Sequence, residues 1–193
     1  MTQLIIATRN AHKVEEIKAI LTQFDVHDLS AVKNPPEVEE TGTTFLENAT
    51  LKAVAISKLT DALVLSDDSG LEVDALNGEP GVYSSRYAGE DGNDSLNNAK
   101  LITELTGQSQ RTARFRSVLV IAKGGKVLSH FEGTVEGNIL EKQQGEGGFG
   151  YDPLFAPIGQ DQSFAELGED IKNTMSHRAN ALAEAAKWFV ENS

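Results

Sequence analysis

The stretch LVLSDDSGLEV, residues 63–73, limits what this chain can fold into more than any other part of it. An apolar run leads into two adjacent carboxylates, Asp67 and Asp68, and a second apolar run begins at Leu71. Short apolar runs bounded by turn residues predict buried strands. Carboxylates buried without a partner are costly, so both acids must be hydrated, paired with cations or bound to a metal. The stretch therefore predicts a strand that ends in an acidic turn. This turn either caps a neighbouring helix or forms a metal or catalytic site, since open α/β sheets bind ligands at strand ends.

The composition narrows the partners that such a site can have. The 193 residues include 29 acids against 17 Lys and Arg, and this net charge of −12 argues against broad binding to nucleic acid or membranes. The absence of Cys excludes disulfides and thiolate sites. Without a signal peptide or an apolar run of about 20 residues, we expect a cytoplasmic protein with no membrane partner. The negative net charge is still compatible with binding one small anion in a local basic pocket. The residues that could form such a pocket are Lys13, Lys52, Arg86, Lys172 and Arg178.

The beginning of the chain predicts a strand, a polar turn and a helix. Residues 4–7 have a buried-strand pattern, and apolar residues recur at helical spacing from Val14 onward. The turn places Thr8, Asn10 and Lys13 at a helix N-terminus, where the dipole and the backbone N–H groups favour an anion. No glycine-rich phosphate loop is present, so this turn is either a different phosphate site or an ordinary capped turn.

The next segment predicts an acidic loop followed by a helix. Thr44 and Glu47 fit a capping box, which marks the start of the helix. Lys52 lies about two turns into it. The acids ahead of the helix, Glu39 and Glu40 among them, are either solvated surface or, for Glu40, a carboxylate able to approach a metal.

The middle of the chain adds a helix and a hairpin. Residues 95–105 predict a helix, and residues 113–123 predict a strong strand. Gly124-Gly125 predicts a tight turn into a further strand over residues 126–131. This hairpin is antiparallel, so the expected fold class is α/β, with a mixed twisted sheet flanked by helices. We find no linker or repeat and expect residues 1–193 to form a single domain.

Residues 145–150, GEGGFG, formally match the dinucleotide fingerprint G-x-G-x-x-G. We reject that interpretation because the motif lies late in the chain and YDP follows it instead of a helix start. The loop is either a binding surface, where Phe149 stacks on a base and Asp152 accepts its N–H groups, or a turn with Phe149 in the core.

The C-terminal segment predicts an amphipathic helix preceded by Ser176, a natural N-cap. His177 and Arg178 then lie in the first helical turn, where cations oppose the helix dipole. This His-Arg pair is therefore a candidate for contacting an anion or a carbonyl-rich base.

Four stretches together resemble the inosine/xanthosine triphosphate pyrophosphatases, a family that removes non-standard purine nucleotides. They are TRNAHK at 8–13, SDDSGL at 66–71, GFGYDP at 148–153, and Lys172 followed by SHR at 176–178. The resemblance covers nearly the whole chain, with the motifs in the family's order. It implies an elongated two-lobed shape, an active-site cleft between the lobes, and a homodimer.

The resemblance also implies roles for the matching residues. Asp68 would bind Mg²⁺ and act as general base on a water molecule. Glu40, with its neighbour Glu39 as the less favoured choice, would be the second metal carboxylate. The implied substrate-binding residues are Thr8, Arg9, Asn10, Ala11, His12, Lys13, Lys52, Ser69, Phe149, Gly150, Tyr151, Asp152, Lys172, His177 and Arg178.

The implied reaction is Mg²⁺-dependent hydrolysis of ITP, dITP and XTP to the nucleoside monophosphate and pyrophosphate. Two alternatives stay open: a pyrophosphatase or phosphatase with another base preference, and a purine-nucleotide sensor that does not catalyse. The pair of Asp68 and Glu40 argues against a pure sensor. Four residues argue for purine recognition over a generic phosphatase: Phe149, Asp152, His177 and Arg178.

Overall fold

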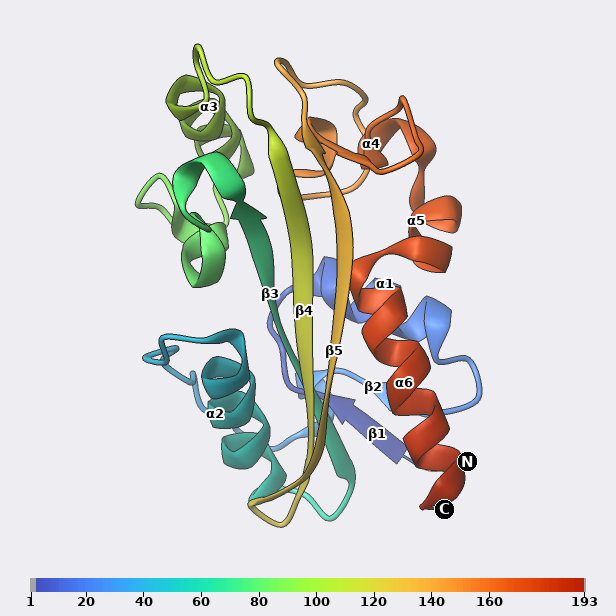
Figure 1. Ribbon diagram of the computed structural model, residues 1–193. Helices are drawn as coiled ribbons and strands as arrows, with labels where there is room; N and C mark the ends of the chain where they lie inside the picture. Colours follow the sequence, from blue (N-terminus) through green and yellow to red (C-terminus); the bar gives the residue numbers. More distant parts are fainter. Residues whose placement is uncertain (1–2, 193) are drawn as a thin grey trace. The chain divides into compact units, whose positions relative to one another are not determined.

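The computed structural model describes residues 3–192, within which six strands form one mixed sheet in the order β2-β1-β3-β4-β5-β6 (Figure 1). β1 pairs in parallel with β2 and β3, whereas β5 and β6 are antiparallel. The mixed sheet expected from the sequence is therefore confirmed. The strands are β1 (Gln3–Ile6), β2 (Asp25–His27), β3 (Leu63–Val73), β4 (Thr112–Lys123), β5 (Lys126–Ile139) and β6 (Phe155–Pro157).

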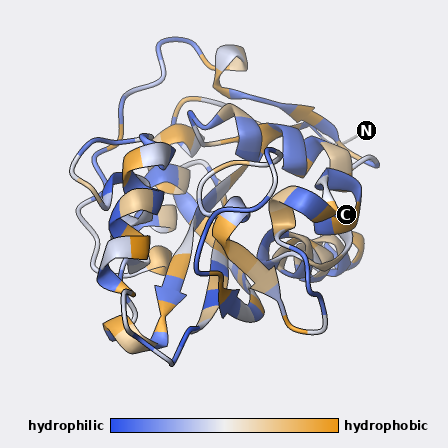
Figure 2. Cartoon of the chain, turned by 90° about the horizontal axis from the view of Figure 1, so that it is seen from above, coloured by the Kyte–Doolittle hydropathy of each residue, from blue (hydrophilic) through white to orange (hydrophobic). Residues whose placement is uncertain are grey.

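Helices α1, α2, α3 and α6 lie in the segments that the sequence predicted to be helical, and the capping box of Thr44 and Glu47 at the start of α2 is confirmed. Figure 2 shows both hydrophobic and hydrophilic residues along the helices, as expected for helices that bury one side and expose the other. No helix within residues 3–192 combines the length and the apolar character needed to cross a membrane. The helices are α1 (Ala11–Ile20), α2 (Phe45–Ser57), α3 (Asp94–Glu104), α4 (Phe164–Leu167), α5 (Glu169–Met175) and α6 (His177–Glu191), with 3₁₀ turns η1 (Leu29–Ala31), η2 (Asp74–Leu76), η3 (Gly81–Arg86) and η4 (Asp152–Leu154).

The described residues group into two compact units, and three strands contribute to both. Unit 1 contains the chain up to Asp68, then Ser117–Gly133, and the segment from Arg178 onward. Unit 2 contains Ser69–Arg116 and Thr134–His177. β3 therefore leaves unit 1 directly after Asp68, in the middle of the strand.

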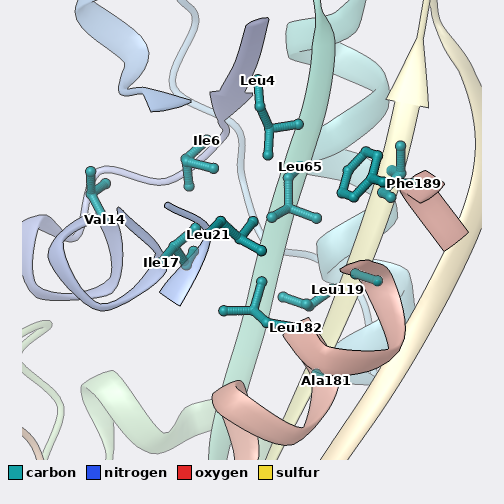
Figure 3. Close-up of a cluster of buried hydrophobic side chains, with 12 residues drawn as sticks. Leu4, Ile6, Val14, Ile17, Leu21, Leu65, Leu119, Ala181, Leu182 and Phe189 are labelled. Carbon is teal, nitrogen blue, oxygen red and sulfur yellow. The ribbon is translucent and has the colours of Figure 1, made fainter. Parts of the chain in front are cut away.

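In unit 1, helices cover both faces of the sheet (Figure 1). Along β4, Leu119 packs against α1 and α6, while the next residue, Val120, packs against Ala49 and Ala53 of α2. This alternation follows from the two-residue period of a strand, and it lets β4 be apolar on both sides. The larger cluster, shown in Figure 3, includes Leu4, Ile6, Val14, Ile17, Leu21, Leu65, Leu119, Leu182 and Phe189.

Unit 2 has a separate core that is rich in aromatic rings. Phe115 of β4 packs on Phe155 of β6 with ring centroids 4.7 Å apart, and Phe155 packs on Phe164 of α4 at 5.4 Å. Leu101 and Leu105, at the end of α3, complete the same cluster. The unit therefore buries its own apolar surface, which is the main contribution to its stability.

The structure corrects the prediction that a strand ends at the two acids. β3 runs without interruption from Leu63 to Val73, so Asp67 and Asp68 lie inside a strand and not in a turn. A buried strand tolerates carboxylates only where cations pair with them, and these cations come from distant parts of the chain.

Three side chains do not lie where the sequence led us to expect them. Leu59 and Val190 continue the apolar spacing of the helices α2 and α6, which predicts burial, but Leu59 follows the end of α2 and is 48% exposed, and Val190, near the end of α6, is 80% exposed. Tyr87, expected to be an exposed aromatic residue, is 8% exposed, and its hydroxyl donates a hydrogen bond to Glu104. Tertiary packing, and not the local sequence, decides burial at these three positions.

Candidate active site

The turn between β1 and α1 forms the helix N-terminus that the sequence predicted. Asn10 is the N-cap residue, and its Oδ1 accepts a hydrogen bond from the backbone N–H of Lys13 at 3.2 Å. The Thr8 hydroxyl accepts the N–H of Asn10 at 3.2 Å. The backbone N–H groups at the start of α1 point out of the helix end, and together with the helix dipole they make the turn suitable for an anion.

The other predicted residues of this turn are at the surface. Arg9 donates from Nη2 to the carbonyl of Pro35 at 3.1 Å, which ties the turn to the loop between η1 and α2. Ala11 and His12 are exposed at the start of α1. All these residues lie near the helix N-terminus, as the motif required.

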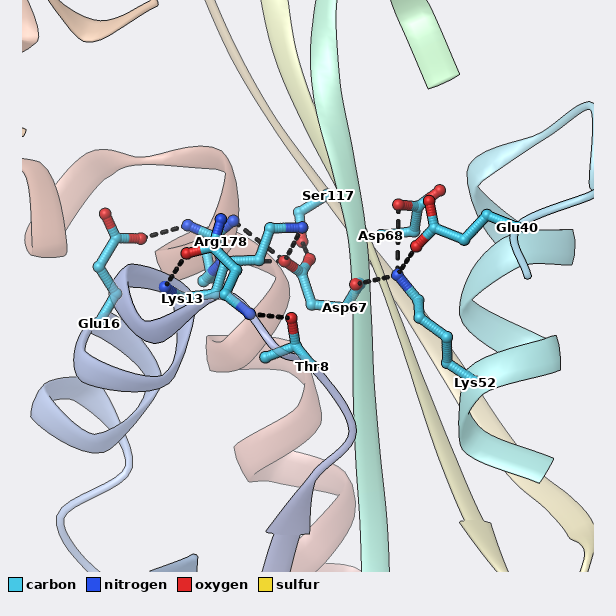
Figure 4. Close-up of polar contacts among 10 residues, drawn as sticks. Thr8, Lys13, Glu16, Glu40, Lys52, Asp67, Asp68, Ser117 and Arg178 are labelled. Carbon is cyan, nitrogen blue, oxygen red and sulfur yellow. Dashed lines mark hydrogen bonds and ion pairs between the residues drawn. The ribbon is translucent and has the colours of Figure 1, made fainter. Parts of the chain in front are cut away.

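Asp67 and Asp68 point to opposite faces of β3, because successive side chains of a strand alternate (Figure 4). Asp67 points to the face covered by α1 and α6, and Asp68 points to the face covered by α2 (Figure 4). Two adjacent acids therefore belong to two different polar clusters.

Asp67 is fully buried at the centre of the first cluster. Its Oδ2 lies 2.9 Å from Lys13 Nζ and 3.0 Å from Arg178 Nη2, and its Oδ1 accepts a hydrogen bond from the Ser117 hydroxyl at 2.6 Å. Arg178, only 1% exposed, also pairs with Glu16 on α1. Two cations and two carboxylates thus neutralise each other in the interior, which a buried ionic cluster requires.

Asp68 belongs to the second cluster, which is organised by Lys52. The Lys52 Nζ donates to Glu40 Oε1 at 2.6 Å, to the Asp67 carbonyl at 2.9 Å and to Asp68 Oδ1 at 3.4 Å. The other carboxylate oxygen of Asp68, Oδ2, is buried with no hydrogen-bond partner among the described residues. Burial outweighs the attraction of Lys52 and raises the pKa of the Asp68 carboxyl, as is typical of a carboxyl suited to accept a proton.

The loop that carries Glu40 is held against the start of α2. Asn48 is fully buried, and its Oδ1 accepts the backbone N–H of Gly42 at 2.8 Å. A Cβ atom on Gly42 would lie 2.7 Å from that Oδ1, so only glycine allows this approach. Glu39 is exposed, whereas Glu40 contacts Lys52, so the geometry favours Glu40 as the carboxylate next to Asp68.

Unit 2 brings together the residues predicted to bind a purine. Lys172 and Asp152 form a buried ion pair at 2.6 Å, and Asp152 Oδ2 also accepts the backbone N–H of Phe149 at 3.0 Å. The Lys172 ammonium lies 4.5 Å from the centre of the Phe149 ring. His177 stacks on Phe115, with centroids 5.0 Å apart and planes at 17°.

Two residues of the same motif have structural contacts. Tyr151 is 3% exposed, lies in the core of unit 2 and donates from its hydroxyl to the Ser84 carbonyl at 2.8 Å, so its ring is not on the predicted binding surface. Gly150 is bound to α3 through both its N–H and its carbonyl. Ser69, the residue after Asp68, is partly exposed in β3.

The predicted metal carboxylates fit a magnesium ion that is bound mainly by a substrate. Among residues 3–192 no three His, Asp or Glu side chains form a metal-binding group. Mg²⁺ does not need one, since it is commonly held by one or two carboxylates plus substrate phosphates. Glu40 and Asp68 share one ammonium group, so the two carboxylates meet at a position that a cation already occupies.

Sequence reasoning gave no role to Asp67, Glu16 or Ser117, which together hold Lys13 and Arg178. Two signals were present in the sequence. Glu16 lies three residues after Lys13 on the same helix, so both share one face. Asp67 and Asp68 are adjacent within a strand pattern, and strand alternation alone would have placed them on opposite faces.

The cluster around Asp67 leads to a pH prediction. Burial alone would raise the pKa of Asp67, but the charges of Arg178 and Lys13 outweigh it and hold this pKa well below its usual range. The stabilisation is then complete above the unfolded-state pKa of about 3.9 and is lost as pH falls toward the folded-state value. Below pH 4 the free energy of unfolding should fall with a slope about 1.4 kcal/mol per pH unit smaller in Asp67→Asn than in the wild type. Urea unfolding between pH 3 and 7 measures this, and equal slopes would contradict it.

Comparison with known proteins identifies the family of this chain. The sequence model of the Ham1 family matches residues 4–188. A dITP/XTP pyrophosphatase of Bacillus licheniformis is 52% identical over 186 residues, covering 94% of this chain and 95% of the relative. Its counterpart in Bacillus subtilis is 49% identical over 191 residues, covering 97% and 96%. The solved structure of the Staphylococcus aureus Ham1 protein has a TM-score of 0.89 at 40% identity, with full coverage of both chains. This chain belongs to the Ham1 family.

Proposed function

We propose that this protein hydrolyses non-standard purine nucleoside triphosphates, namely ITP, dITP and XTP, to the nucleoside monophosphate and pyrophosphate. The observation that carries the proposal is the 52% identity, over 94% of the chain, to a relative named dITP/XTP pyrophosphatase. We further propose that the enzyme is a homodimer, as the family resemblance implies, and that it works in the cytoplasm. The buried carboxylate of Asp68 beside Lys52 and Glu40 supports the chemistry.

The triphosphate is held at the N-terminus of α1. The hydroxyl of Thr8, the side chain of Asn10 and backbone N–H groups of the first turn donate to phosphate oxygens, with Arg9, Ala11 and His12 lining the same turn. Lys13 and Lys52 add positive charge on either side of β3. These two lysines already contact the pair of acids, so their ammonium groups are held in place before the substrate arrives.

Asp68 is the general base. Its raised pKa makes it a stronger proton acceptor than an exposed carboxylate, and its Oδ2 accepts the proton of the attacking water. The water oxygen bonds to the α-phosphorus, the bond from that phosphorus to the bridging oxygen breaks, and pyrophosphate leaves with the electron pair. Lys52 stabilises charge that develops beside Asp68. Glu40 and Asp68 would hold Mg²⁺, which supplies neutralisation of the phosphate charge.

Purine recognition falls to unit 2. The ring of Phe149 stacks on the base, and Asp152, fixed by Lys172, accepts an N–H of its edge. His177 or Arg178, adjacent at the start of α6, donates to the 6-oxo group. Ser69, which follows Asp68 in β3, is a further substrate contact. Adenine carries an amino group at that position and would leave a donor unpaired, at a cost of about 1–3 kcal/mol.

The test is release of pyrophosphate from ITP, XTP, GTP and ATP in the presence and absence of Mg²⁺. We expect fast release from ITP and XTP, slow release from GTP and ATP, and none without a divalent cation. Orthophosphate as the product would refute the reaction. A different order of substrates would make this a pyrophosphatase of another base preference, and tight ITP binding without turnover would make it a sensor.

A further inference from the structure

The loop that carries Phe149 is bound to α3, an element far from it in the sequence. The side-chain Nδ2 of Asn98 donates to the carbonyl of Gly150 at 2.9 Å. The Oδ2 of Asp94 accepts the N–H of the same Gly150 at 2.7 Å. Both polar backbone groups of one glycine are therefore held by two side chains that are one helical turn apart on α3.

The opposite side of the loop is equally constrained. Asp152 accepts the N–H of Phe149, and a Cβ atom on Gly148 would lie 2.2 Å from its Oδ2. Gly148 and Gly150 have φ values of 72° and 62°, which glycine adopts freely. Phe149 is thus the one residue with a large side chain between two glycines, fixed through Asp152 on one side and through α3 on the other.

We propose that Asn98, assisted by Asp94, is a positioning residue for purine binding: it fixes the Gly148–Gly150 loop so that Phe149 is ready to stack on the base. This inference rests on the proposed function, in which Phe149 contacts the purine. A glycine-rich loop has many backbone conformations, and ordering it on binding would cost affinity. The hydrogen bonds from α3 order the loop before the purine binds, so binding does not have to supply this entropy cost.

Asn97 provides a matched control on the same helix. Asn97 and Asn98 are both 2% exposed, and both bind the backbone of a loop. Asn97 donates to the Ser85 carbonyl at 3.0 Å and accepts the N–H of Ala88 at 2.8 Å, so it holds the end of η3. Truncating either Asn leaves partly buried backbone groups unpaired, but only Asn98 is attached to the loop of Phe149.

The experiment compares Asn98→Ala with Asn97→Ala in steady-state hydrolysis of ITP and in inhibition by tripolyphosphate, which has no base. For Asn98→Ala we expect KM for ITP to rise about tenfold, the equivalent of one unpaired buried group, with kcat changed less than about twofold. The inhibition constant of tripolyphosphate should not change, because the phosphate residues lie in unit 1. Asn97→Ala should keep the wild-type KM.

Three outcomes would overturn the proposal: an unchanged KM in Asn98→Ala, an equal rise of KM in Asn97→Ala, or an equal weakening of tripolyphosphate. If Asn98→Ala does not fold, Asp94→Ala replaces it, because Asp94 is only partly buried and the variant should show the same pattern with a smaller rise.

Amide hydrogen exchange separates this proposal from the proposed function. Exchange in residues 145–151 should be faster in Asn98→Ala than in the wild type, and unchanged in Asn97→Ala. If the wild type neither binds nor hydrolyses ITP, the proposed function fails, and the exchange rates still decide whether Asn98 orders the loop. Equal exchange in all three proteins would refute the positioning role whatever the substrate.

Discussion

Replacing Asp68 with Asn is expected to lower kcat for ITP by about 10²–10⁴-fold, the usual contribution of a general base. The amide has the same shape and still accepts a hydrogen bond from Lys52, so the arrangement of Lys52 and Glu40 is kept. What is lost is the ability of Oδ2 to take a proton from water.

The same variant should be no less stable than the wild type. Burial raises the pKa of Asp68, which means that folding disfavours its charged form, and the neutral amide avoids that cost. Loss of activity with an unchanged or higher Tm therefore identifies a functional carboxylate and excludes misfolding. Asp61→Asn, an exposed acid ahead of the same strand, is the control and should keep full activity. A kcat within about threefold of wild type in Asp68→Asn would rule out the role of general base.

Replacing Arg178 with Met is expected to have the largest effect on stability. Its guanidinium pairs with Asp67 and Glu16 in the interior, and both carboxylates are at most 7% exposed. Removing the cation leaves them buried with only part of their compensation, which typically costs about 3–5 kcal/mol. For a chain of this length the Tm should fall by roughly 6–20 °C. Urea unfolding at pH 7 gives the free energy directly.

Arg114→Met is the matched control for Arg178. Arg114 pairs with Asp74 at 3.0 Å and with Glu136 at 2.9 Å, but its side chain is 29% exposed. Solvent screens such pairs, so this variant should lose no more than about 1 kcal/mol. Similar losses in the two variants would mean that the cluster around Asp67 is no more important to folding than a surface network.

The behaviour of Arg178 also bears on purine recognition. The sequence motif implied a direct contact with the base, yet the guanidinium is 1% exposed and engaged by two carboxylates. Its predicted contact with the substrate stays a prediction, and the stability of Arg178→Met tests the contribution that the geometry supports. A large loss of stability would make an activity change in this variant difficult to assign to base recognition.

Local features of this protein were predictable because their causes are local. The capping box of Thr44 and Glu47 joins residues three apart, and the N-cap of Asn10 lies at the start of the helix it caps. The two glycines at 124 and 125 both have positive φ, as the predicted tight turn requires. A helix cap or a hairpin turn is stabilised by contacts among neighbouring residues, so the local sequence is enough to predict it.

The sequence by itself determined the mixed sheet, the positions of the longer helices and the set of candidate catalytic and binding residues. Only the tertiary structure decided which polar cluster each of the two adjacent acids joins. Whether β3 could continue through Asp67 and Asp68 depended on Ser117, 50 residues away, and on Arg178, 111 residues away. A carboxylate can remain in a buried strand only where distant cations and donors meet it, and no pattern within the strand reveals where those partners will lie.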